Sequence, residues 1–184
     1  GVSLTRGSWK MYMDGKFIYA DTVMLQVLLR TYEYSVWDQE TNSFAMKSVQ
    51  KTVLSGEFPD NTGGNKCGRL TRDEEDGLAK DDPRYLHSRS VVCNQVVYGK
   101  ISGEFADADG NPVVLEDQPV IAYFKRSGFK PVADFIDSLS RQKKVMQKVV
   151  ARMDTNKNKK GSVTFWTPLM TYSSEVSITD KDKE

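Results

Sequence analysis

Histidine and cysteine are scarce in this sequence, and their scarcity limits the chemistry that it can support. The 184 residues include one histidine, His87, and two cysteines, Cys67 and Cys93. Two cysteines do not make the disulfide framework of a small secreted scaffold, so we expect reduced thiols in the cytoplasm. One histidine leaves a Ser-His or Cys-His nucleophile with a single candidate base, in an acidic loop. We therefore expect no catalytic residues and interpret the chain as a binding protein, not an enzyme.

The spacing of metal ligands is missing as well. Cys67 and His87 are twenty residues apart, His87 and Cys93 are six apart, and neither Cys-x-x-Cys nor His-x-x-x-His occurs. Structural zinc sites use short paired spacings. The pattern favours buried thiols and a surface imidazole over a metal site, so no metal and no cofactor are expected.

Long apolar runs and an excess of charge are also absent. No run of 18 apolar residues occurs, and the first twenty residues lack the order of a signal peptide. We expect a soluble cytoplasmic protein without a membrane segment. The net charge is +1, from 26 basic and 25 acidic residues, so a positive surface requires local clustering of charge.

A β-hairpin is the clearest local prediction. In "MYMDGKFIY" the pair Asp14-Gly15 stands between aromatic-rich flanks. The two turn positions of such a hairpin need positive φ, which these residue types adopt most easily. Residues 11–19 therefore predict two antiparallel strands joined by a two-residue turn.

A long strand is predicted after Thr22. Apolar side chains alternate on one face from Val23 to Leu29, and that face turns polar at Thr31. We expect the buried parity to flip near Arg30 through a bulge or sharp coil, as in a strand that serves two faces of a small closed barrel. A two-faced first strand is a feature of oligonucleotide-binding barrels. A helix beginning at Thr22 also fits the first eight residues.

Residues 55–89 are predicted to be a long loop or insertion. They are rich in Gly, Asp and Asn and show little periodicity. A structureless stretch of this length is usually functional or partly disordered. The segment "NTGGNKCGR" matches no phosphate-binding glycine motif, but Lys66 and Arg69 would reach phosphates if the segment acts as a flap.

One helix is predicted, in "KPVADFIDSLSRQ". Apolar residues recur at helical spacing from Val132 to Leu139, and Pro131 suits the first turn. The remaining segments between residues 9 and 172 have the features of strands. The predicted fold class is mainly β with one helix: an OB-like antiparallel five-stranded barrel with extra hairpins and a long insertion loop. Residues 1–172 would form this single domain and residues 173–184 a flexible polar tail.

A basic stretch, "RQKKVMQKVVARMDTNKNKK", follows the helix. Lys144, Lys148 and Arg152 are four residues apart and share a face in a strand or in a helix. We favour a strand because the neighbouring valines are β-branched. A hairpin that closes in "TNKNKKG" would then place Val150 near Trp166, with cations on both sides of the indole.

A second hairpin gives the same combination of side chains. Closing it in "DQETNS" would bring Trp37 opposite Phe44 and Tyr34 near Lys47. A slip of one residue would reverse the faces of either hairpin.

Aromatic rings interleaved with cations suit single-stranded nucleic acid. Exposed bases stack on rings at roughly 1–3 kcal/mol each, while Lys and Arg follow the phosphates. An ordinary half-buried sheet, on which lysine stems cover apolar surface, stays open as the alternative. The candidate stacking residues are Tyr32, Tyr34, Trp37, Phe44 and Trp166. The candidate phosphate-binding residues are Lys47, Lys51, Lys125, Arg126, Lys144, Lys148, Arg152, Lys157, Lys159 and Lys160.

In layout the chain resembles the OB-fold single-stranded DNA-binding proteins of bacteriophages. The resemblance covers most of residues 9–172: strands first, a Gly-containing insertion, the segments "GKISG" and "YFKRSGF", one helix before a basic hairpin, and a polar tail. It implies a viral protein that coats and protects single-stranded DNA, without sequence specificity, during DNA replication, recombination or repair in the host cytoplasm. Family members carry an acidic tail that recruits replication proteins, whereas here Lys181 and Lys183 offset the acids.

The expected partner is single-stranded DNA, with RNA, replication proteins and a homo-oligomer left open. The alternative function is a virion or scaffold module that pairs its strands with another protein and binds no nucleic acid. Strong self-association or capsid co-purification would favour that alternative. A metal-dependent nucleic-acid enzyme is a third reading, which a stoichiometric metal ion would favour.

Replacing Lys144, Lys148 and Arg152 with alanine should reduce the salt dependence of binding to single-stranded DNA. Each lost phosphate contact lowers the slope of log K against log salt by about 0.7 for single strands. Fluorescence anisotropy at several salt concentrations measures the slope. A slope equal to that of the unmodified protein would exclude these three residues from phosphate binding.

Overall fold

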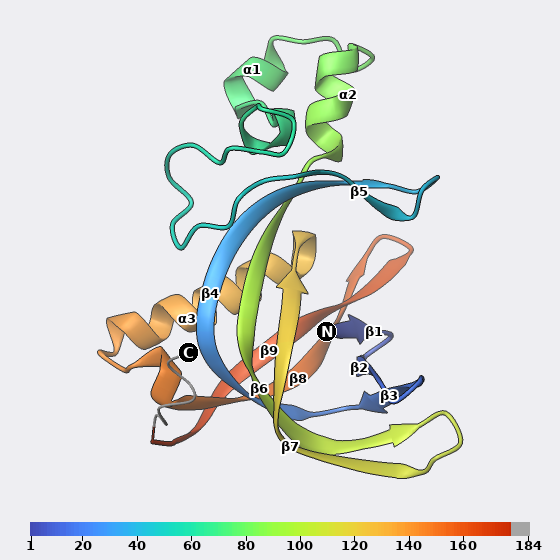
Figure 1. Cartoon of the computed structure of the whole chain (residues 1–184), viewed down its shortest axis with the longest axis vertical. Helices are drawn as coiled ribbons and strands as arrows, with labels where there is room; N and C mark the ends of the chain where they lie inside the picture. Colours follow the sequence, from blue (N-terminus) through green and yellow to red (C-terminus); the bar gives the residue numbers. More distant parts are fainter. Residues whose placement is uncertain (178–184) are drawn as a thin grey trace. The chain divides into compact units, whose positions relative to one another are not determined.

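The computed structural model describes residues 1–177, in two compact units. Unit 1 is built from residues 1–30 and from residue 96 onward, and unit 2 from residues 31–95. The elements within unit 1 are β1 (Val2–Thr5), β2 (Ser8–Met13), β3 (Lys16–Ala20), β7 (Pro112–Phe124), α3 (Phe129–Arg141), β8 (Val149–Lys160) and β9 (Val163–Glu175) (Figure 1). Two long strands have one part in each unit: β4 (Val23–Asp38) and β6 (Val92–Asp107).

The strands of the described residues form one mixed sheet of nine. Five of them pair in a closed ring: β3 pairs with β2, β2 with β1, β1 with β7, β7 with β6, and β6 returns to β3. The prediction of a mainly β chain is confirmed. The prediction of an antiparallel sheet is wrong, because β1 pairs with β7 in parallel, with Val2 opposite Ala122. Periodicity within a four-residue strand carries no information on which distant strand it joins or in which direction.

The predicted hairpin at Asp14-Gly15 is confirmed. β2 ends at Met13, β3 begins at Lys16, and the two turn residues have φ of 50° and 82°. Both turn residues are therefore left-handed, which a glycine adopts without steric cost and an aspartate tolerates.

The core of unit 1 consists of side chains that the strands and α3 turn inward. Trp9 of β2 is fully buried, and its indole N–H donates to the Met153 carbonyl at 3.1 Å. Val132 and Ile136 of α3 join the same cluster, and α3 packs on β9 (Figure 1). The predicted helix is confirmed, although it begins two residues before Pro131.

Unit 2 contains the segment that was predicted to be a long loop. Its elements are β5 (Ser43–Lys47), the short 3-10 turn η1 (Lys66–Gly68), α1 (Arg72–Asp76) and α2 (Pro83–Ser90). The prediction of one helix is therefore wrong. α1 begins with a capping box between Thr71 and Glu74, and α2 begins after Asp82, whose carboxylate accepts from the Arg84 amide at 2.9 Å. Both helices are short and depend on polar capping, so they leave no apolar periodicity in the sequence.

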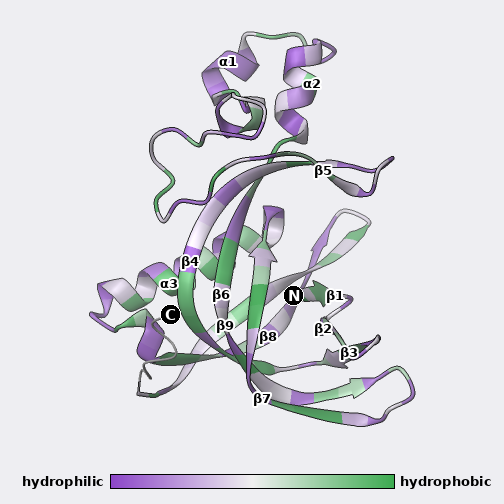
Figure 2. Ribbon diagram, viewed as in Figure 1, coloured by the Kyte–Doolittle hydropathy of each residue, from purple (hydrophilic) through white to green (hydrophobic). Residues whose placement is uncertain are grey.

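The predicted flip of buried parity in β4 is wrong. β4 is a strand, but the polar residues Thr31, Glu33 and Ser35 are buried on the same parity as Val23, Leu25 and Val27, although Leu29 between the two groups is exposed. The Thr31 hydroxyl donates to Gln50 and the Asn94 amide donates to Ser35, each at 2.8 Å. Hydrogen bonds thus satisfy the buried hydroxyls of Thr31 and Ser35, so the polar residues did not mark an exposed face. In Figure 2 the hydrophobic colour of β4 gives way to hydrophilic colour toward β5.

The limits of the predicted domain and tail remain predictions. Residues 173–175, which the sequence assigns to the tail, continue β9, and residues 178–184 lie outside the described residues. Among residues 1–177, every helix is too short or too polar to span a bilayer.

A side chain at position 99 should destabilise unit 1. Gly99 lies in β6, and a Cβ there would stand 2.3 Å from the backbone carbonyl oxygen of Gln26. A backbone atom cannot swing aside, so Gly99→Ala should lower the free energy of unfolding by about 1–3 kcal/mol. Urea unfolding followed by tryptophan fluorescence measures the change.

Gly128→Ala is the matched control in the same unit. Its Cβ would meet the Pro168 ring at an ordinary 3.7 Å, at a negative φ. Equal stability of the Gly99→Ala and Gly128→Ala variants would contradict the close approach of β6 to β4.

Candidate nucleic-acid interface

The outer face of the β2–β3 hairpin carries two aromatic rings and a lysine. Tyr12 and Phe17 are 60% and 47% exposed, and their ring centroids lie 5.1 Å apart, edge to face. Lys10 Nζ lies 4.0 Å from the Phe17 centroid. None of the three is among the residues predicted from the sequence. Side chains alternate between the two faces of a strand, so their positions on either side of the hairpin turn could have placed these three residues on one face.

The β4–β5 hairpin presents a second ring pair, in unit 2. Trp37 and Phe44 lie opposite each other, as predicted, with centroids 5.0 Å apart. They are 46% and 45% exposed. Lys47 Nζ lies 4.8 Å from the Phe44 centroid. An exposed ring pair with a cation beside it has the composition on which unpaired bases stack.

Two other predicted stacking residues of unit 2 are more enclosed. Tyr32 is buried, and Tyr34 packs edge to face on Phe58 with centroids 5.0 Å apart. Lys47 pairs with Ser35 instead of Tyr34, so the predicted register was wrong by one residue at that point. A register shift in this hairpin between residues 36 and 37 explains why the Trp37 pairing was nevertheless correct.

Lys51 has an internal structural role. Its Nζ donates to the carbonyl oxygens of Ser55 and Glu57, at 2.7 and 2.9 Å, and lies 4.6 Å from the Phe58 centroid. The loop after β5 therefore wraps around this ammonium group. A phosphate would have to displace two hydrogen bonds to reach it.

The β8–β9 hairpin pairs Trp166 with Lys157. β8 continues to Lys160, so "TNKNKKG" is mostly strand and the hairpin turns later than predicted. Val150 lies opposite Ser174, and the predicted pairing with Trp166 is wrong. Lys157 is the residue opposite Trp166, with Nζ 5.9 Å from its ring centroid.

Trp166 is half-buried against the turn between β1 and β2. A Cβ at Gly7 would lie 2.9 Å from the indole Nε1, and the Thr155 hydroxyl donates to the Gly7 carbonyl at 3.1 Å. The indole therefore lies directly on the Gly7 backbone. One part of the ring is used for packing, and the rest is available to a ligand.

The three cations at four-residue intervals do not share one strand. Lys144 follows α3, Lys148 ends a short 3-10 turn, and Arg152 lies in β8. The Gln26 amide of β4 donates to the Gln147 carbonyl at 2.7 Å, which anchors the turn. The predicted single cationic face is therefore wrong, because the chain turns before β8 begins.

Two of these cations have local partners. Lys144 Nζ lies 3.9 Å from the centroid of Tyr172, a ring that is 45% exposed and was not predicted. Arg152 lies 2.9 Å from the Asp154 carboxylate, and it lowers the pKa of Asp154 together with the Thr22 hydroxyl. A surface ion pair of this kind contributes about 0–1 kcal/mol, so a phosphate could compete for Arg152.

The other predicted phosphate-binding residues lie at exposed positions on separate elements. Lys157, Lys159 and Lys160 come together at the end of β8, whereas Lys125 and Arg126 follow β7. The described cations thus gather at hairpins and turns instead of in one row. The exposed members are Lys125, Arg126, Lys148, Arg152, Lys157, Lys159 and Lys160.

Glu33 is a fully buried carboxylate close to Lys47. Gln50 donates to Glu33 Oε2 at 3.1 Å, and Lys47 Nζ lies 3.8 Å from Oε1, which accepts no hydrogen bond within the described chain. Burial raises the pKa of Glu33, while the Lys47 charge and the Gln50 hydrogen bond lower it in part. The net shift is upward, so the protonated form is favoured relative to a free glutamic acid.

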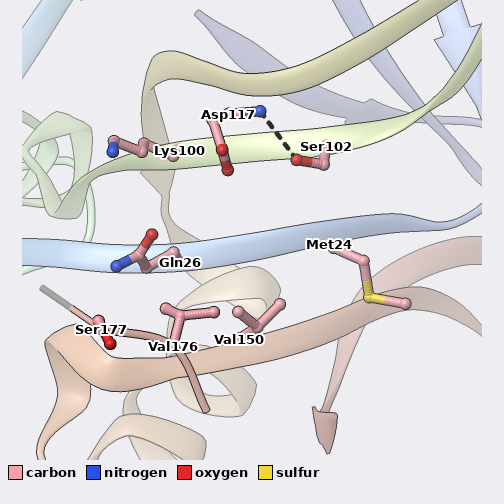
Figure 3. Close-up of a pocket in the computed structure, with 8 residues that line it drawn as sticks. All are labelled: Met24, Gln26, Lys100, Ser102, Asp117, Val150, Val176 and Ser177. Atoms are coloured by element: carbon pink, nitrogen blue, oxygen red, sulfur yellow. Dashed lines mark hydrogen bonds between the residues drawn. The ribbon is translucent and has the colours of Figure 1, made fainter. Parts of the chain in front are cut away.

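A pocket in unit 1 opens beside β4, β6 and β8. It encloses about 150 Å³, less than the roughly 300–1,000 Å³ of typical small-molecule sites. Asp117 N donates to the Ser102 hydroxyl at 2.9 Å, and Lys100 and Asp117 have opposite charges (Figure 3). This balanced lining favours neither an anion nor a cation. The lining residues are Met24, Gln26, Lys100, Ser102, Asp117, Val150, Val176 and Ser177.

The thiols and the histidine do not assemble a metal site in the described chain. No group of three or more His, Cys, Asp or Glu side chains with metal-binding geometry occurs within residues 1–177. His87 Nε2 instead lies 2.8 Å from the Cys67 carbonyl oxygen. Burial raises the pKa of the Cys67 thiol to about 11.

Glu33→Gln should stabilise the protein in a pH-dependent manner. Because the folded pKa lies above the ordinary value of 4.5, the native state retains this proton to higher pH than the unfolded chain does. The stability that the group contributes is present below pH 4.5 and is lost as the pH rises through the folded pKa. Glutamine keeps the acceptor for Gln50 and has no charge to bury, so the variant should gain stability at pH 7–8 and lose that gain below about pH 4.5.

Urea unfolding across this pH range measures the effect. Glu40→Gln, at an exposed position in the same unit, is the matched control and should change stability little at any pH. A Glu33→Gln effect that is the same at pH 4 and pH 8 would contradict a raised pKa.

No family model, curated protein or solved structure matches the chain. The resemblance to single-stranded DNA-binding proteins of bacteriophages therefore stays a prediction. The geometry of the described residues carries the inference of function.

Proposed function

We propose that this chain binds single-stranded nucleic acid, with single-stranded DNA as the leading candidate, without sequence specificity and without catalysis. The observation that carries the proposal is a repeated surface unit: an aromatic ring on a strand, exposed or half-buried, with a lysine ammonium beside it. The pairs are Phe17 with Lys10, Phe44 with Lys47, Tyr172 with Lys144 and Trp166 with Lys157.

The energies favour exchange of the lysine for a base. An exposed cation beside a ring contributes about 0.5–1 kcal/mol, whereas a stacked base contributes about 1–3 kcal/mol. A base can therefore take the ring face, and the flexible lysine can move to the adjacent phosphate. Each ring with its lysine would then contact a nucleotide twice: the ring stacks on the base, and the ammonium group pairs with the phosphate.

Single strands suit these surfaces better than a duplex. A duplex hides its base faces, so exposed rings gain little from it. The helix α3 also lacks the character of a groove-reading helix, because Asp134 and Asp137 are on its exposed side and pair with Lys130 and Arg30. Carboxylates at that surface would repel phosphates.

The closed ring of five strands supports a more specific fold proposal. We propose that it is an OB-type nucleic-acid-binding fold, to which the β4–β5 and β8–β9 hairpins are added. The biological role that goes with such a fold is the coating and protection of single strands during replication, recombination or repair, in a phage-infected cell.

Fluorescence anisotropy with labelled oligo-dT and with a matched duplex tests the proposal. Binding should be tighter to the single strand, weaken with salt, and quench tryptophan emission, because Trp37 and Trp166 lie in the surface units. Absence of binding at low salt, together with strong self-association, would contradict the proposal and favour the protein-interaction alternative.

Removal of one ring pair should weaken single-strand binding. Trp37→Ala and Phe44→Ala should each raise Kd by about fivefold to a hundredfold, the equivalent of about 1–3 kcal/mol. Val114→Ala, at a position 71% exposed and outside the ring pairs, is the control and should leave Kd unchanged. An effect of the control equal to that of the ring variants would count against stacking.

A further inference from the structure

Unit 2 contains a pocket of its own. A pocket of about 230 Å³ is lined by Tyr34, Lys66, Arg69, Leu70, Thr71 and Cys93. The lining has two cations, two hydroxyls, a thiol and no carboxylate. The two cations favour an anion, because hydrogen bonds from a charged donor to an anionic oxygen are stronger than neutral ones.

Both cations retain hydrogen-bond donors for a ligand. Arg69 Nη1 donates to the Val91 carbonyl at 2.8 Å, which fixes the guanidinium and uses one of its five N–H groups. Lys66 Nζ lies 5.9 Å from the Tyr34 ring centroid. No ion pair with a described residue occupies either cation.

The field of these cations reaches the thiol. Burial raises the pKa of Cys93, while a hydrogen bond from the Tyr34 hydroxyl and the charges of Arg69 and Lys66 lower it. The same position would favour an anionic oxygen of a ligand. The carboxylate of Glu74 accepts hydrogen bonds from the Thr71 amide and hydroxyl at 2.8 and 3.0 Å.

A strained turn holds the two cations in place. Lys66, Cys67 and Gly68 are consecutive left-handed residues, with φ of 51°, 55° and 82°. Such a backbone is strained at each residue that has a side chain. The Asp60 carboxylate accepts from Cys67 N at 2.9 Å, and His87 Nε2 lies 2.8 Å from the Cys67 carbonyl oxygen.

We infer that this pocket binds one phosphate group through Lys66 and Arg69. Its volume is below the roughly 300–1,000 Å³ of sites that enclose a whole small molecule, so it fits a single anionic group better than a complete nucleotide. The phosphate would be either free or part of a polynucleotide. The inference goes beyond the proposed function, because the pocket can bind inorganic phosphate whether or not the chain binds a polynucleotide. Inorganic phosphate alone can therefore test it.

Alkylation of Cys93 provides the readout in the full chain. Cys67, the other cysteine, is fully buried, so neutral iodoacetamide should modify Cys93, as peptide mass spectrometry would verify. At a phosphate concentration about ten times Kd the rate constant should fall about tenfold, since only the empty pocket reacts. Chloride at equal ionic strength should leave the rate unchanged. Equal rates in phosphate and chloride would overturn the inference.

Variants distinguish phosphate binding by the pocket cations from a general effect of positive charge in unit 2. Lys66→Gln should remove most of the protection by phosphate, whereas Lys80→Gln, at an exposed position in the same unit, should keep it. Arg69→Lys keeps the charge but not the fixed guanidinium and should weaken protection. Protection that is equal in Lys66→Gln and the unmodified protein would overturn the assignment.

Oligo-dT with a 5′-phosphate and with a 5′-hydroxyl distinguishes the sources of phosphate. Protection by the first alone assigns a terminal phosphate, protection by both assigns an internal one, and protection by inorganic phosphate alone assigns a free ion. Each of these outcomes supports the pocket. Oligonucleotide binding without protection by any phosphate would overturn the pocket and leave the proposed function intact, whereas protection without oligonucleotide binding would do the reverse.

Discussion

The pairing of β3 with β6 is the constraint on which the surface of unit 1 depends. Ile18 pairs with Asp107 across these two strands, and the Lys16 ammonium group lies 3.0 Å from the Asp107 carboxylate. The ring of five strands closes at this point. Closure fixes which parity of each strand faces the core. Since Ile18 is buried, its neighbour Phe17 must face outward. The exposed ring beside Lys10 is therefore a consequence of how the ring of strands is closed.

The surface units in the two parts of the chain share a physical logic. In each, a strand places an aromatic ring at the surface, and a lysine ammonium lies 3.9–5.9 Å from the ring centroid. The lysine covers apolar area while the ring is free and can pair with a phosphate when a base arrives. Under the proposed function, such surfaces would hold a flexible nucleic-acid strand at several weak points, which suits binding without sequence specificity.

The sequence predicted local structure well, but it did not predict which distant strands pair or which side chains they bury. The Asp14-Gly15 turn, the helix α3 and the Trp37–Phe44 pair were predictable, because turn chemistry and helical spacing act over a few residues. The buried parity of β4 was not, because Glu33 and its neighbours stay inside through hydrogen bonds with distant residues. The β8 register failed because charged residues up to Lys160 continue the strand, although their composition resembles a loop. The Lys66–Arg69 segment was predicted as a source of cations, but its pocket depends on tertiary contacts.

Photo-crosslinking would show whether the exposed rings contact nucleic acid, because it reports which residues a single strand touches. Oligo-dT would be bound to the full chain, irradiated, and the crosslinked peptides identified by mass spectrometry. The account predicts crosslinks in the peptides that contain Tyr12 or Phe17, Trp37 or Phe44, and Trp166. Crosslinks confined to α1, α2 or other segments without these rings would contradict it.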